Sequence, residues 1–169
     1  MRGMAVTRQL ARIPEPQLTG CRAPVEELDR LCSFQAASQR DYLDLNWWGI
    51  VLASLGKHHP SLAVLDQALR RVEAVNPAYR DHHDTIAEHP ATAWRPREVS
   101  RFAEGLRALT PSAISDALPS DQDAVEVPGT DATDVDGDLA HHLVEQFGLM
   151  RDFYGEAADR HLAVVLWWD

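Results

Sequence analysis

The sequence predicts an α+β fold: a single compact domain over residues 1–169, with about five helices packed on a small sheet that the C-terminal strand closes. Three observations support this. The chain has 169 residues, 45% of them hydrophobic, which suits one domain with a sizeable core. Several segments repeat apolar residues at three- and four-residue steps, as helices that bury one face do. Four of the five tryptophans form the doublets Trp47-Trp48 and Trp167-Trp168, and the second ends an apolar stretch. We therefore expect the closing strand to lie in the core and the doublets to share one interior.

Three segments have strand character. Residues 4–13 form the first, although Arg8 and Arg12 interrupt its alternation. Residues 91–95 form a short second strand. The stretch 162–168 is apolar at every position, which predicts a central strand covered on both faces. The order of the strands in the sheet stays open.

The helical segments carry recognisable start and stop residues. Pro24 suits the first turn of a helix, and Asp44 and Ser61 are suitable N-caps. The predicted helices span residues 25–32, 45–55 after Asp44, 62–72 after Ser61, 96–109 and 139–154, with a further helical turn at 112–118.

Charge is distributed unevenly along the chain. Sixteen basic residues against 26 acidic ones give a net charge of −10, which disfavours nucleic acid and anionic membranes as partners. Residues 119–138 are acidic and almost without large apolar groups, so we expect a flexible loop. Such a loop suits a protein partner with a basic surface.

The sequence also bears on location. The N-terminus lacks the apolar stretch of a signal peptide, and no apolar run reaches the roughly 18 residues that cross a bilayer. Cys21 and Cys32 are too few for a disulfide framework, and we expect reduced, part-buried thiols. These features predict a cytoplasmic protein that does not bind membranes.

Three groups of residues stand out by their order and spacing: YLDLNWWG at 42–49, EHPATA at 88–93 followed by PREV at 96–99, and RDFY at 151–154 followed by the closing apolar stretch. Together they resemble the YfbM-like family of bacterial proteins, a domain of unknown function. The resemblance runs from residue 4 to 169 except for the acidic loop. It implies a small cytoplasmic α+β protein with no assigned activity. Many members have a histidine after the tryptophan that matches Trp47, where this chain has Trp48.

Histidine doublets are the main candidates for metal chemistry. Within the sequence Asp81-His82-His83-Asp84, the side chains of Asp81, His82 and Asp84 could supply nitrogen and oxygen ligands to zinc. Adjacent residues point apart on a helix and to opposite faces of a strand, however, so a doublet rarely gives two ligands to one metal. No sequence motif for zinc, nucleophilic catalysis or phosphate binding is present, so we expect no cofactor.

Two hypotheses about function remain open. The first is a non-catalytic binding or regulatory module that binds a small ligand or another protein, for example to neutralise it. Candidate contact residues are Asp44, Trp47, Trp48 and Trp94, although N-capping and core packing explain the same residues. The alternative is a metal-assisted hydrolase that uses the segment Asp81–Asp84 together with a histidine of the last helix.

Overall fold

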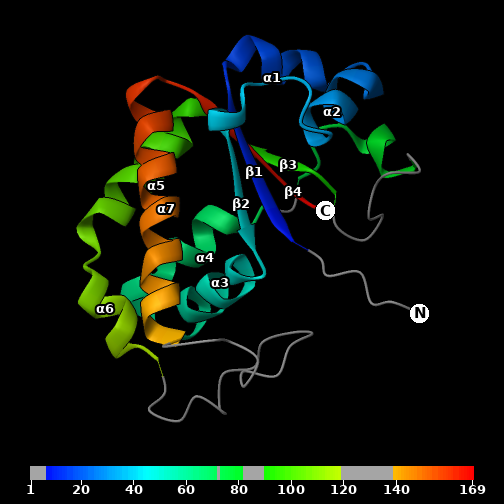
Figure 1. The fold of residues 1–169 in the computed structure, drawn as a ribbon. Helices are drawn as coiled ribbons and strands as arrows, with labels where there is room; N and C mark the ends of the chain where they lie inside the picture. Colours follow the sequence, from blue (N-terminus) through cyan, green and yellow to red (C-terminus); the bar gives the residue numbers. More distant parts are fainter. Residues whose placement is uncertain (1–6, 72, 82–89, 119–138) are drawn as a thin grey trace, which may run out of the picture.

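The computed structural model describes residues 7–71, 73–81, 90–118 and 139–169, and it shows an α+β domain (Figure 1). These residues form four strands and seven α-helices, against the roughly five helices expected. In chain order the elements are β1 (Arg8–Ile13), α1 (Glu15–Cys21), α2 (Val25–Cys32), β2 (Tyr42–Asn46), α3 (Trp48–His58), α4 (Ala63–Leu69), β3 (Thr92–Trp94), α5 (Pro96–Ala108), α6 (Pro111–Asp116), α7 (Leu139–Asp159) and β4 (Ala163–Trp168).

The sheet is antiparallel, with strand order β2-β1-β4-β3. The closing strand β4 therefore lies between β1 and β3, where Leu166 is opposite Leu10 on one side and Thr92 on the other. All but the last of its residues are buried. The prediction of a central C-terminal strand is confirmed.

Helices cover both faces of the sheet and make two cores. Alternate residues of β1 and β4 point to opposite faces. Leu10, Val164 and Leu166 face the larger core, which packs against α3, α4, α5, α6 and α7. Ala11 and Trp167 face the smaller core, which packs against α1 and α2. Figure 1 shows these two groups of helices on either side of the strands.

The two tryptophan doublets do not share an interior. Trp48 belongs to the larger core and Trp167 to the smaller one, on the other face of the sheet. The reason is the pleat of β4, which sends Trp167 and Trp168 to opposite faces. The prediction of one common tryptophan core was wrong.

Asp44 is not the N-cap that the sequence suggested. It lies in strand β2, opposite Gln9 of β1, and its Oδ1 accepts a hydrogen bond from the backbone N–H of Asn46 at 2.6 Å. Helix α3 begins at Trp48, after Asn46 has turned the chain with a φ of 52°. The run YLDLN has the two-residue alternation of an edge strand, and strand pairing outweighed the capping preference of Asp44.

Other boundaries differ by a few residues. Strand β1 ends at residue 13 as expected, before Pro14. Helix α1 follows at once with Pro16 in its first turn, a position where proline loses no hydrogen bond. Helix α4 ends at Leu69 instead of residue 72, and α7 continues to Asp159. The expected acidic loop, 119–138, and residues 82–84 lie outside the described residues.

Candidate functional site

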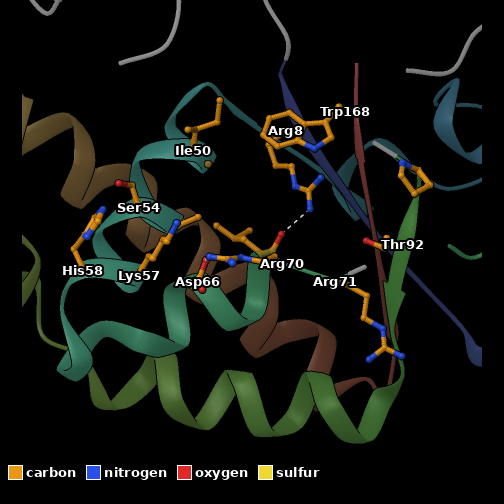
Figure 2. Close-up of a pocket in the computed structure, with 14 residues that line it drawn as sticks. Arg8, Ile50, Ser54, Lys57, His58, Asp66, Arg70, Arg71, Thr92 and Trp168 are labelled. Atoms are coloured by element: carbon orange, nitrogen blue, oxygen red, sulfur yellow. Dashed lines mark hydrogen bonds and ion pairs between the residues drawn. The ribbon is translucent and has the colours of Figure 1, made fainter. Parts of the chain in front are cut away.

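A cavity of about 520 Å³ lies where β1 and β4 meet helices α3 and α4 (Figure 2). Its wall includes Arg8 of β1, Thr92 of β3 and Trp168 of β4. Ile50 and Ala53 of α3 line another side. Its volume falls in the range of about 300–1,000 Å³ that small-molecule sites occupy.

The local sequence explains why the cavity forms beside Arg8. Arg8, Leu10 and Arg12 alternate along β1, so all three point to the face that carries α3 and α4. Gly49 allows α3 to approach, since a Cβ at this position would lie 2.8 Å from the Cβ of Arg8. Helix α3 therefore passes close enough to the strand to make a wall.

Arg8 is the unusual residue of this wall. Its side chain belongs to a residue that is only 6% exposed. Nη2 donates to the backbone carbonyl of Leu69 at 2.6 Å, and the guanidinium carbon lies 4.6 Å from the centre of a Trp168 ring. A guanidinium has five N–H groups, and within the described residues no carboxylate pairs with this one. Burial lowers the pKa of Arg8 to about 10, so it is still charged at neutral pH.

Arg12 shows how this fold neutralises an equally buried arginine. Its side chain is 4% exposed, four residues along the same face of β1. Nε lies 2.8 Å from Asp41 Oδ1, and Nη2 lies 3.0 Å from Glu156 Oε2. Nη2 also donates to the carbonyl of Arg40 at 3.0 Å. Nη1 donates to the carbonyl of Phe153 at 3.4 Å. Arg12 thus has two carboxylates and two carbonyls, whereas Arg8 has one carbonyl among the described residues.

Thr92 forms part of the cavity wall, but its hydroxyl oxygen is buried behind that wall. The residue is 2% exposed, and its hydroxyl has no hydrogen-bond partner in the described part of the chain. Buried polar side-chain atoms without a partner are uncommon, because each forfeits its hydration. Figure 2 shows Thr92 across the cavity from Ser54, on the same side as Arg8 and Trp168.

The remaining charges around the cavity are mostly compensated or exposed. Arg70 forms an ion pair with Asp66 at 2.6 Å. Arg71 pairs with Glu73 at 2.8 Å and lies 3.6 Å from Glu98. Lys57 is exposed on the last turn of α3. The chain has a net charge of −10. The lining of the cavity is nevertheless positive, because Arg8 and Lys57 add to the compensated pairs.

The cavity does not contain an activated nucleophile among the residues that are described. Ser54 and His58 lie one turn apart on α3, but no hydrogen bond joins them, and the hydrogen bonds of Asp66 come from Arg70. Hydrolytic nucleophiles need a base within hydrogen-bond reach. Cys21 and Cys32 are free thiols away from this cavity, and both are buried where the sequence predicted partial burial. Burial raises the pKa of Cys21 to about 11, so it is a poor nucleophile at neutral pH.

The residues that the sequence singled out lie elsewhere. Trp47 and Trp48 stack with ring centres 4.0 Å apart, and Trp48 is buried in the larger core. Trp94 is buried in the same core and donates from Nε1 to the carbonyl of Ala68 at 2.9 Å. Asp44 is exposed on the edge strand. None of these four lines the Arg8 cavity.

The metal hypothesis remains a prediction. Asp81 ends a 3₁₀ turn, Pro77–Asp81, while His82, His83 and Asp84 are outside the described residues. Over the described ranges, no three histidine, cysteine or acidic side chains are grouped as metal ligands. His141 is exposed on α7, and the ring of His142 stacks on Trp48 with ring centres 6.0 Å apart.

Sequence reasoning missed Arg8, Thr92 and Trp168 as site residues. The one available signal was an arginine inside an apolar strand, which was interpreted only as a flaw in the alternation. An arginine on a covered strand must find a counter-charge or carry a function. Arg12 has found its counter-charge in Asp41. Arg8 has no counter-charge in the described structure.

Comparison with protein-family models, curated proteins and solved structures finds no match to this chain. The resemblance to the YfbM-like family therefore stays a prediction. Among the described residues, no helix combines the length and apolar character that crossing a bilayer requires.

Proposed function

We propose that this chain is a non-catalytic binding protein whose ligand is a small anion held by Arg8. The observation that carries the proposal is a buried guanidinium, without a carboxylate partner in the described structure, in the wall of an open cavity of about 520 Å³. A buried charge costs several kcal/mol unless it is paired. A bound anion would supply the missing partner.

Binding is favoured over catalysis by the other groups of the cavity. Ser54 lacks a hydrogen-bonded base within the described structure, and Asp66 is engaged by Arg70. The groups that remain can orient and neutralise an anion, and in the described structure no hydrogen bond joins Ser54 to His58 to activate the hydroxyl. A regulatory role, in which the anion changes the stability of the fold, is consistent with this arrangement.

Two further parts of the functional hypothesis are retained as proposals. A protein partner for the acidic segment 119–138 and a hydrolase centred on residues 81–84 both depend on residues outside the described ranges. A cytoplasmic location also stays a proposal.

Thermal unfolding in different sodium salts tests the anion site. We expect phosphate, acetate or benzoate to raise the Tm above its value in chloride at equal ionic strength, because a ligand of the folded state stabilises it. The increase should be lost in Arg8→Met and kept in Arg71→Met, since Arg71 lines the same cavity but pairs with Glu73 and Glu98. The proposal is wrong if wild type and Arg8→Met respond alike to every anion.

A further inference from the structure

We infer that the ligand is a small organic monocarboxylate, with its carboxylate on Arg8 and an apolar body along Ile50 and Ala53. This inference rests on the proposed function and deepens it by naming the chemical class of the ligand. Three observations favour this class over an inorganic anion or a phosphate ester: the charge balance, the arrangement of donors on Arg8, and the apolar part of the wall.

The positive charges around the cavity favour a ligand with a single negative charge. Arg70 and Arg71 already have carboxylate partners at 2.6 Å and 2.8 Å. Lys57 is exposed to solvent, where its charge is screened. Arg8 is then the one buried cation of the cavity without a counter-ion in the described structure. A monocarboxylate neutralises it, whereas a phosphate ester with about −1.5 to −2 charges near neutral pH would bury excess negative charge.

Contacts with its neighbours fix the orientation of the Arg8 guanidinium. The carbonyl of Leu69 holds Nη2 at 2.6 Å, and Trp168 covers one face at 4.6 Å. The N–H groups that remain are directed in the plane of the guanidinium. A planar carboxylate accepts two parallel N–H bonds from such an edge, which gives both strength and orientation.

The rest of the wall fits a ligand body larger than a bare carboxylate. The cavity holds about 520 Å³, and Ile50, Ala53 and Trp168 give it an apolar side. Burying apolar atoms of the ligand there contributes affinity in proportion to area.

Calorimetric titration with three benzene derivatives tests the ligand class. Benzoate carries the carboxylate, benzamide is its neutral counterpart, and phenyl phosphate carries the larger charge. We expect benzoate to bind at least about tenfold more tightly than either of the others, since a charged hydrogen-bonded pair is worth a factor of that order.

Variants locate the binding. Arg8→Met should weaken benzoate by at least about tenfold, and Arg8→Lys, which keeps the charge but loses the planar fork, should fall between Arg8→Met and wild type. Arg71→Met is the matched control and should bind benzoate as wild type does. Circular dichroism of each variant confirms that it is folded.

The possible failures separate this inference from the proposed function. Tighter binding of phenyl phosphate, or equal binding of benzamide, overturns the monocarboxylate and leaves an Arg8-dependent anion site in place. The same holds if benzoate gives no saturable heat while another anion raises the Tm of wild type but not of Arg8→Met. If no anion distinguishes wild type from Arg8→Met, both proposals fail.

Discussion

Two buried arginines on strand β1 differ in the partners of their guanidinium groups. Arg8 and Arg12 lie four residues apart on the same face of β1, and both are buried. Arg12 places its guanidinium against Asp41, Glu156 and a Phe153 ring at 4.8 Å. Arg8 meets Trp168 and the carbonyl of Leu69. The proposal that Arg8 is a binding residue rests on this difference in partners, because the two residues do not differ in burial.

The two arginines should differ in their effect on stability. Arg12→Met breaks two ion pairs at a buried position and leaves the carbonyls of Arg40 and Phe153 without their donor, so it should lower the free energy of unfolding by about 2–4 kcal/mol. Arg8→Met removes a charge that has no counter-ion in the described structure and keeps an apolar stem, so its cost should be smaller by about 2 kcal/mol. Urea unfolding of both variants measures this difference. An equal loss of unfolding free energy in the two variants would mean that Arg8 has a counter-ion, and would contradict the proposed anion site.

At the scale of elements, the packing of α3 depends on two glycines spaced two turns apart. Gly49 lets α3 approach Arg8, and Gly56 lets it approach α4. A Cβ at Gly56 would meet the backbone nitrogen of Asp66 and lie 2.9 Å from the carbonyl oxygen of Leu62. Backbone atoms cannot rotate away as the end of a side chain can. The two contacts hold α3 against β1 and α4, and so define the wall of the cavity.

Alanine substitutions test that packing. Gly56→Ala should lower the free energy of unfolding by at least about 2 kcal/mol, because the backbone of α4 must move to admit a methyl group. Gly20→Ala is the control, since a Cβ at that position in α1 meets no atom within 4 Å. It should raise the free energy of unfolding by about 0.5–1 kcal/mol, because alanine is the better helix former. Guanidinium chloride unfolding measures both, and a neutral Gly56→Ala would show that α3 and α4 are less closely packed.

The elements also show what the sequence could predict. Continuous apolar character identified β4 as a central strand, and helical periodicity identified α2, α5 and α7. Strand β2 was missed because Asp44 offered a plausible N-cap, and the pairing with β1 that decides between the two is not a local property. The cavity could not be predicted for the same reason. Arg8, Thr92 and Trp168 come from three strands, and only the sheet order brings them together.

At the scale of the whole molecule, an ion network joins segments far apart in the sequence. Asp41 Oδ1 accepts from Arg12 Nε at 2.8 Å and from Arg160 Nη1 at 2.7 Å. Glu156 of α7 pairs with Arg12 as well. The network therefore ties β1 and α7 to the 3₁₀ turn Gln39–Asp41 that precedes β2. Burial alone would raise the pKa of Asp41, but the hydrogen bonds from Arg160 and Arg12 outweigh it and hold the pKa below 3.8.

This pKa predicts how stability depends on pH. Because the folded state lowers the pKa of Asp41, the network contributes fully above about pH 3.8, the unfolded value. That contribution is lost as the pH falls through the lower, folded value. Asp41→Asn lacks this titration, so the difference in free energy of unfolding between wild type and Asp41→Asn should shrink as the pH is lowered from 6 towards 3. Urea unfolding across this range provides the test, and a difference independent of pH would contradict it.

The most direct test of an anion site at Arg8 is the NMR signal of its own side chain. In protein labelled with ¹⁵N-arginine, the Nε–Hε signals of Arg8 and Arg12 are assigned with Arg8→Met and Arg12→Met, and wild type is titrated with benzoate. We predict a saturable shift of the Arg8 signal, while that of Arg12, which already donates from Nε to Asp41, stays in place. An Arg8 signal that does not move, or two signals that move together in proportion to added salt, would contradict the account.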